Sequence, residues 1–164
     1  MKIKSVAVVT GASQGIGQAT ALRLARDFSV IVLTARQESE LEKTASAVKL
    51  AGAEPLVYAL DLREPSSAEM VVKGTLERFG RIDALLNIAG AVMTGRRQSF
   101  FENWAPAHNM SVEEAMKRFP EEAGISRFGK PEEIADLMAY LVSPAAKWMT
   151  GSCVRMDGGE VKGI

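Results

Sequence analysis

Short apolar runs alternate with segments of helical periodicity through the first 90 residues, and this alternation restricts the possible folds more than any other feature. The run SVAVVT at residues 5–10 is typical of a strand buried on both faces of a parallel sheet. The expected strands are 5–10, 29–34, 55–60 and 81–90, and the expected helices are 15–27, 39–51 and one that begins at Pro65. This order predicts a doubly wound parallel α/β sheet with helices on both faces, in a single domain over residues 1–164.

The second half of the chain loses this rhythm. Residues 91–110 have no clean period and are expected to form a loop or short irregular helices. Ser111 and Glu114 have the spacing of a capping box for a short helix at 111–119, and Pro131 opens a clearer helix at 131–142. Residues 152–156 are expected to form a last strand. The apolar stripes expected to face the core are Ala68, Val72, Thr75, Leu76 and Phe79 after Pro65, and Ile134, Leu137, Met138 and Leu141 in the helix at 131–142.

The segment TGASQGIG at residues 10–17 connects the first strand to the first helix. Glycine lets the backbone turn tightly and approach a phosphate closely, and the helix N-terminus then offers free N–H groups to a pyrophosphate. Turns also need glycine, but the position in a β–α–β unit favours dinucleotide binding. The residues expected to form this loop site are Gly11, Ser13, Gln14, Gly15, Ile16 and Gly17.

Residues at the carboxyl ends of the other strands are the next candidates, because ligands of open α/β sheets bind there. Asp61 can accept a hydrogen bond from an adenine amine, or it can cap the following helix. Asn87 can brace its strand or contact a ribose. The small residues Ala89 and Gly90 let a cofactor ring approach the backbone.

The second strand ends in Thr34, Ala35 and Arg36, which bears on the choice of nicotinamide cofactor. An acidic residue here would bind a ribose 2′-hydroxyl and repel a 2′-phosphate, whereas the Arg36 guanidinium suits the 2′-phosphate. We therefore expect NADP(H) in preference to NAD(H). The alternative is a solvated arginine at a helix start, and Gln14 supplies no second positive charge.

Composition excludes several other classes of function. Twenty basic residues balance twenty acidic ones and are interspersed with them, so we expect no nucleic-acid partner. We expect no membrane partner either, since no apolar run approaches the ~20 residues that span a bilayer, and residues 1–9 resemble a first strand more than a signal peptide. The single cysteine, Cys153, suits a reducing cytoplasm. There is no His/Cys cluster for a metal, and the lone His108 is expected to be solvated.

Four motifs together resemble the short-chain dehydrogenases/reductases over nearly the whole chain. TG-x-x-x-G-I-G at 10–17 is similar to the cofactor loop of that family, and Asp61-Leu62 to its adenine-contacting pair. Asn87-Ile88-Ala89-Gly90 resembles its Asn-Asn-Ala-Gly motif, with Ile88 in place of the second Asn. Residues 127–159 match its C-terminal helix and strand. The resemblance implies a Rossmann-like fold and an oxidoreductase that acts on a small carbonyl or alcohol substrate.

The same resemblance shows what this sequence lacks. Catalysis in the family uses a Tyr-x-x-x-Lys pair on one helix face and an earlier Ser. Here Tyr58 is followed four positions later by Leu62, and Tyr140 by Pro144, so neither tyrosine can serve. The sequence therefore predicts no catalytic residue, and the fold is incomplete relative to the family.

The junction lies between Gly90 and Met93. Val92-Met93-Thr94 resembles the end of a Pro-Gly-x-x-x-Thr motif that follows a later strand of the family, so Thr94 would contact the nicotinamide carboxamide and the aromatic residues after it would belong to a substrate lid. Two interpretations stay open. Either the natural protein has an internal segment here, which would appear as a chain break near 90–93, or the chain is a short dinucleotide-binding or self-associating module.

The omission also has structural consequences. Either the last strand shifts beside the fourth, or a sheet edge and apolar surface are left exposed. We expect a homo-oligomer, with the last strand and its helix as the remaining self-association surface.

Overall fold

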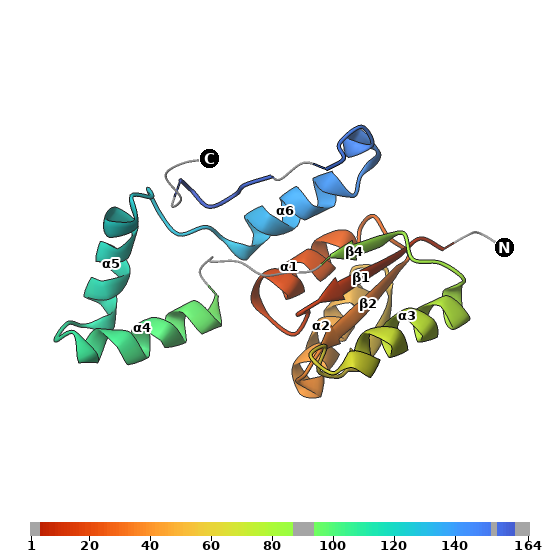
Figure 1. Ribbon diagram of the computed structural model, residues 1–164, viewed down its shortest axis with the longest axis horizontal. Coiled ribbons are helices and arrows are strands. Elements are labelled where there is room, and N and C mark those ends of the chain that lie inside the picture. Colours follow the sequence, from red (N-terminus) through yellow and green to blue (C-terminus); the bar gives the residue numbers. More distant parts are fainter. Residues whose placement is uncertain (1–3, 87–93, 152–153, 160–164) are drawn as a thin grey trace.

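The computed structural model describes residues 4–86, 94–151 and 154–159. The first half of the chain forms a four-stranded parallel sheet in the order β3-β2-β1-β4 (Figure 1). The strands are β1 (Val6–Thr10), β2 (Val30–Ala35), β3 (Glu54–Ala59) and β4 (Ala84–Leu86). They are connected by the helices α1 (Gly15–Leu24), α2 (Glu38–Leu50) and α3 (Pro65–Phe79). The predicted parallel α/β fold is confirmed.

The strands bury both of their faces, as their apolar runs predict. Ala7 and Val9 of β1 belong to a core cluster with residues of α1 and α2, whereas Val6 and Val8 belong to a second cluster with Val71 of α3. Alternate residues of one strand point to opposite faces of its sheet. Helices α1 and α2 therefore cover one face, and α3 covers the other.

The Asp83 side chain attaches the start of β4 to β1. Its carboxylate accepts a 2.8 Å hydrogen bond from the Val6 N–H and also pairs with the Arg81 guanidinium. The hydrogen bonds from Arg81 lower the pKa of Asp83 below its usual range, and the hydrogen bond from the Val6 N–H makes a smaller contribution in the same direction. Val6 is fully buried, so its N–H has no access to water as a substitute acceptor.

We expect Asp83→Ala to lower the free energy of unfolding by about 1–3 kcal/mol, because it leaves a buried N–H without a partner. A carboxyl group whose pKa is lowered by folding stabilises the fold at pH values above its unfolded pKa of about 3.9. This stabilisation is lost as the pH falls through the pKa of the folded state. Urea unfolding at several pH values should therefore show that the free energies of unfolding of the natural chain and of Asp83→Ala converge below about pH 4. Asp136→Ala, which removes an ion-paired side chain that is 71% exposed, is the control and should cost less than about 1 kcal/mol.

The predicted stripe of α3 is confirmed at Thr75 but wrong at Ala68, Val72 and Leu76, because the helix is rotated about its axis. Its buried residues are Ser67, Val71 and Thr75. Phe79 is half-buried, whereas Ala68, Val72 and Leu76 are exposed. The valines of β1 and β2 select Val71 as the inward residue. On the other flank, Val72 and Leu76 are 44% and 43% exposed.

The second half is more helical than expected. Residues expected to form a loop or irregular helices contain α4 (Gly95–Ala107). The helix at the predicted capping box is confirmed but longer, as α5 (Val112–Ala123). The Glu114 N–H donates to Ser111 Oγ over 3.2 Å, and Glu114 Oε2 accepts from the Ser111 N–H over 2.8 Å. Phe101 and Ala105 of α4 pack with Ala115 of α5 in a small core of their own.

Helix α6 (Pro131–Leu141) packs on α1, as Figure 1 shows. Its most buried residues are Ala135 and Ala139, while the predicted Ile134, Leu137, Met138 and Leu141 are half-buried. Small residues at the contact let the two helices approach closely. Arg23 Nε of α1 also donates to Asp136 Oδ1 over 3.0 Å. A 3₁₀ helix, η1 (Pro144–Ala146), follows.

The predicted last strand is not formed in its described part. Residues 154–156 have no strand structure, and residues 152 and 153, including Cys153, lie outside the described residues. The described sheet therefore ends at β4, where Leu85 is 59% exposed. Of the two expected consequences of the omission, an exposed edge with apolar surface is the one that the described residues show.

Candidate functional site

A cavity of about 300 Å³ opens at the carboxyl ends of β1, β2 and β3. All ten of the predicted site residues that the structure describes line it: Gly11, Ser13, Gln14, Gly15, Ile16, Gly17, Arg36, Asp61, Leu62 and Thr94. Asn87, Ala89 and Gly90 lie outside the described residues, as does the predicted break near 90–93. The structure thus gathers residues from four separate segments around one cavity.

The glycine loop adopts a conformation that side chains would disrupt. Gly11 and Gly15 have φ angles of 64° and 57°, in the left-handed region that favours glycine. A Cβ on Gly17 would lie 2.2 Å from the carbonyl oxygen of Gly11. The first turn of α1 can therefore pack this closely against the loop only because residue 17 has no side chain. Its free N–H groups lie beside the cavity.

Thr94 lines the same cavity, although it lies more than 70 residues after the glycine loop in the sequence. It is the N-cap residue of α4, and its Cγ2 atom would lie 2.9 Å from a Cβ on Gly15. The start of α4 is therefore packed against the glycine loop. Thr94 also lines a neighbouring cavity with Gly15 of the loop and Pro131 at the start of α6.

Asp61 lines the cavity, and its carboxylate is paired with Arg63. Its oxygens accept from Arg63 Nε over 3.1 and 3.0 Å and from the Arg63 N–H over 3.0 Å. These Arg63 hydrogen bonds, with a smaller contribution from the charge of Arg36, lower the pKa of Asp61 to about 2. The alternative that Asp61 caps the next helix is wrong, since the N-cap residue of α3 is Glu64.

Arg36 is exposed at the cavity rim, and its side chain makes no hydrogen bond to a described residue. Its guanidinium is thus available to a ligand. Next to it, Thr34 lines the cavity and is fully buried, with a hydroxyl that has no described partner. Sequence reasoning missed Thr34 as a site residue, along with Gln37 and Leu60. Their position at the ends of the two strands that supply Arg36 and Asp61 could have identified them.

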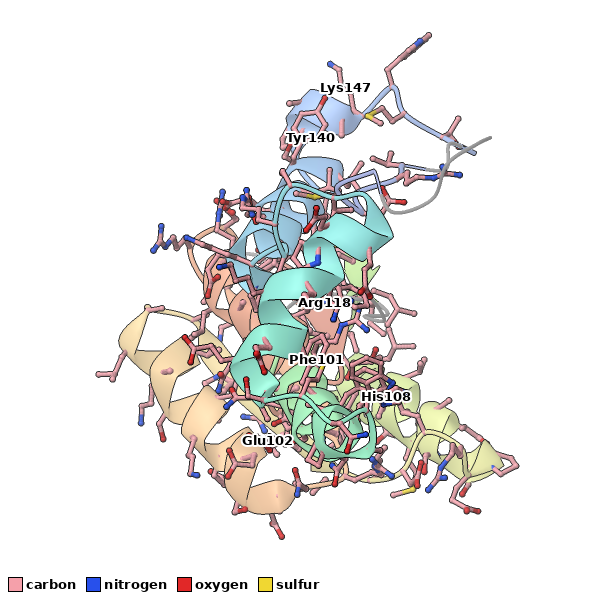
Figure 2. All side chains as sticks on the ribbon, turned by 90° about the vertical axis from the view of Figure 1, so that its left-hand side faces the viewer. Phe101, Glu102, His108, Arg118, Tyr140 and Lys147 are labelled. Atoms are coloured by element: carbon pink, nitrogen blue, oxygen red, sulfur yellow. The ribbon has the colours of Figure 1, made fainter. Side chains whose placement is uncertain are left out.

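The remaining chemically active side chains lie elsewhere. Tyr58 packs under α3, with its hydroxyl beside Gly74, and Tyr140 is half-exposed on α6. His108 was expected to be simply solvated. It is exposed, but its ring stacks on Trp104 at 3.9 Å and its Nδ1 lies 2.9 Å from the Trp104 carbonyl oxygen. In Figure 2, Tyr140 lies in the upper part of the view and His108 well below it.

Other classes of site find no support in the described ranges. Among these residues, no group of three or more His, Cys, Asp or Glu side chains could hold a metal ion. No helix in the same ranges has the length and apolar character needed to cross a bilayer.

Comparisons with known proteins match both halves of the chain. A family model described as short chain dehydrogenase matches residues 5–118, and one described as enoyl-(acyl carrier protein) reductase matches residues 105–160. A putative ketoacyl reductase of the monensin polyketide synthase from Streptomyces virginiae is 44% identical over 85 residues, which are 52% of this chain and 33% of that protein. The chain thus spans about a third of the length of the first relatives it matches.

Two further comparisons cover nearly the full length of both this chain and the protein it is compared with. A probable 2,4-dienoyl-CoA reductase of Bacillus subtilis is 22% identical over 245 residues, with 96% of each chain covered. The L-sorbose reductase of Gluconobacter frateurii, solved with NADPH and L-sorbose, is 20% identical with a TM-score of 0.90, covering 99% of this chain and 98% of that one. An alignment over 245 residues with a chain of 164 leaves at least 81 positions without a counterpart here.

The family models span nearly the whole sequence, and the fold agrees with them over the described residues. The chain belongs to the short-chain dehydrogenase family.

Proposed function

We propose that this chain binds NADP(H) in the cavity of about 300 Å³, as the dinucleotide-binding part of an oxidoreductase for a small carbonyl or alcohol substrate. The observation that carries the proposal is that residues chosen as cofactor ligands from the sequence alone line one cavity at the strand ends. Membership of a family of dehydrogenases and reductases supports it.

The residues present fit such a cofactor. The glycine loop, in which a Cβ on Gly17 would collide with Gly11, would receive the pyrophosphate at the N-terminus of α1. Asp61, Leu62 and the strand ends would hold the adenosine. Thr94 would hold the nicotinamide carboxamide, with Asn87, Ala89 and Gly90 beside it by family resemblance. When bound, the nicotinamide supplies or accepts the hydride.

The charges at the rim favour NADP(H) over NAD(H). Arg36 offers its donors freely, and Ala35 before it carries no carboxylate to repel a 2′-phosphate. The Asp61 carboxylate is already paired with Arg63. A solved relative with NAD⁺, a xylitol dehydrogenase, is 37% identical at a TM-score of 0.50, so family membership alone does not decide the cofactor.

We propose further that the 164-residue chain itself turns over no substrate, because it has no Tyr-x-x-x-Lys pair. The catalytic side chains of the natural protein would then belong to an internal segment at 90–93. We also propose that the natural protein is cytoplasmic and that the chain forms a single domain. An intact mass well above 17.7 kDa for the protein from its native source would support this origin. A mass of 17.7 kDa would favour the second candidate, a non-catalytic dinucleotide-binding module.

Titration of the purified chain with NADPH, followed by the fluorescence of the reduced nicotinamide, tests the proposal directly. We expect saturable binding in the micromolar range and weaker binding of NADH. In parallel, NADPH oxidation with a panel of ketones and aldehydes should not exceed the rate without protein. Absence of binding at millimolar NADPH would reject the cofactor site, and protein-dependent oxidation would reject the inactive state.

A further inference from the structure

Arg63 lies just outside the cavity at the strand ends and binds a carboxylate that lines it. Of the described residues around this cavity, Asp61 is the only anion and Arg36 the only cation. Arg63 is not among them, and its side chain is 78% exposed, against 27% for that of Asp61. An effect of Arg63 on a ligand in the cavity would therefore act through Asp61.

The Arg63 side chain binds the Asp61 carboxylate at both oxygens. Arg63 Nε lies 3.1 and 3.0 Å from the two oxygens, and Arg63 Nη2 donates to Oδ2 over 2.5 Å. The backbone N–H of Arg63 also donates to Oδ1 over 3.0 Å. Hydrogen bonds between a guanidinium and a carboxylate are among the stronger ones in proteins. With a pKa of about 2, Asp61 carries its negative charge at neutral pH.

The sheet places this carboxylate next to Arg36. Strands β2 and β3 pair in parallel as far as Ala35 and Ala59, and the Leu60 N–H then donates to the Ala35 carbonyl oxygen over 2.9 Å. Arg36 and Asp61 are the residues that follow this last hydrogen bond on the two strands. The charge of Arg36 also contributes to the lowered pKa of Asp61. The two side chains therefore act on the same part of the cavity.

An unpaired carboxylate at position 61 would disfavour a 2′-phosphate in two ways. It would repel the phosphate, which carries a charge of about −1.5 to −2 at neutral pH, from within the same cavity. It would also attract the Arg36 guanidinium, which makes no hydrogen bond to a described residue, and would compete with the phosphate for it. Pairing with Arg63 opposes both effects. A ligand without a 2′-phosphate is subject to neither.

We infer that Arg63 is a positioning residue for cofactor selectivity, which pairs with Asp61 and so leaves Arg36 free for the 2′-phosphate of NADP(H). The inference rests on the proposed function, since it concerns the cofactor of the same cavity. It does not depend on the internal segment proposed at 90–93. The residues involved follow β2 and β3, which lie on the side of the sheet away from β4.

Fluorescence titration of the 164-residue chain with NADPH and with NADH tests this role. In Arg63→Ala, we expect the dissociation constant for NADPH to rise ~10-fold and that for NADH to change less than ~2-fold, because only the 2′-phosphate meets the freed carboxylate. Retained NADH binding shows that the variant is folded. Asp61→Asn in the Arg63→Ala background removes the freed charge, and should return the ratio of the two constants to within ~2-fold of the natural ratio.

Arg127→Ala is the matched control. Arg127 donates to both oxygens of Glu133 over 2.8 and 2.6 Å and lowers the pKa of Glu133 to about 2, but neither residue lines the cavity. This variant should bind both cofactors as the natural chain does.

The possible outcomes separate this inference from the proposed function. An unchanged ratio in Arg63→Ala, equal losses for both cofactors, or a double variant whose ratio is not restored would overturn the inference and leave the proposed function standing. A natural chain that binds neither cofactor, or both with equal affinity, would reject the proposed NADP(H) site and the inference with it.

Discussion

Alanine in place of Gly17 is expected to weaken NADPH binding by at least ~100-fold, because a displaced loop would lose hydrogen bonds to the charged pyrophosphate that are worth about 1.5–3 kcal/mol each. The added Cβ would lie 2.2 Å from the Gly11 carbonyl oxygen and 2.6 Å from its carbon. Backbone atoms cannot swing aside as a flexible side chain does, so the loop must move away from α1. Fluorescence titration with NADPH measures the effect.

Gly95→Ala is the matched control for this substitution. Its Cβ would meet only Gln14 Oε1 at 4.0 Å, and its φ angle is not in the left-handed region. It should bind NADPH as the natural chain does. Thermal unfolding of both variants separates a displaced loop from an unfolded protein. Unchanged NADPH affinity in a folded Gly17→Ala variant would show that the pyrophosphate does not lie on this loop.

Glutamate in place of Arg36 should weaken NADPH binding ~100-fold and NADH binding less than ~3-fold, because only the 2′-phosphate loses an ionic hydrogen-bond partner and meets a like charge. The second pKa of a phosphate ester is about 6. Affinity of the natural chain for NADPH should therefore fall as the pH drops below ~6, while that for NADH should not. Parallel titrations with both cofactors at several pH values measure this difference.

Arg26→Glu, at an exposed position beyond the end of α1, makes the same charge change away from the cavity. Its NADPH affinity should stay within ~2-fold of the natural value, since separated exposed charges are screened. Equal losses for NADPH and NADH in Arg36→Glu would assign Arg36 to the adenine or the fold instead of the 2′-phosphate.

The strands and the cavity residues could be predicted because each depends on local sequence. Buried parallel strands need continuous apolar runs, which β1 and β2 have. Parallel strands end at one edge of the sheet, so Arg36 and Asp61 were expected to lie near the glycine loop. Thr94 was different, because only family resemblance connected it with a loop more than 70 residues earlier.

What the sequence did not reveal depends on tertiary packing. The rotation of α3 is set by the valines of β1 and β2, which select Val71 instead of Val72. Helix α4 was not predicted because its apolar residues include the adjacent Phe100 and Phe101, which blur a helical stripe, and because Pro106 lies inside it. The pairing of Asp61 with Arg63 depends on a side-chain conformation, which spacing alone does not fix.

The packing of α6 on α1 has a consequence for how this chain tolerates change. The first and last of the long helices clasp each other through Ala135, Ala139 and the Arg23–Asp136 pair. This contact between α1 and α6 connects the two halves of the chain and does not involve the polypeptide between Leu86 and Thr94. We therefore expect that a segment inserted between Leu86 and Thr94 leaves the cavity at the strand ends intact.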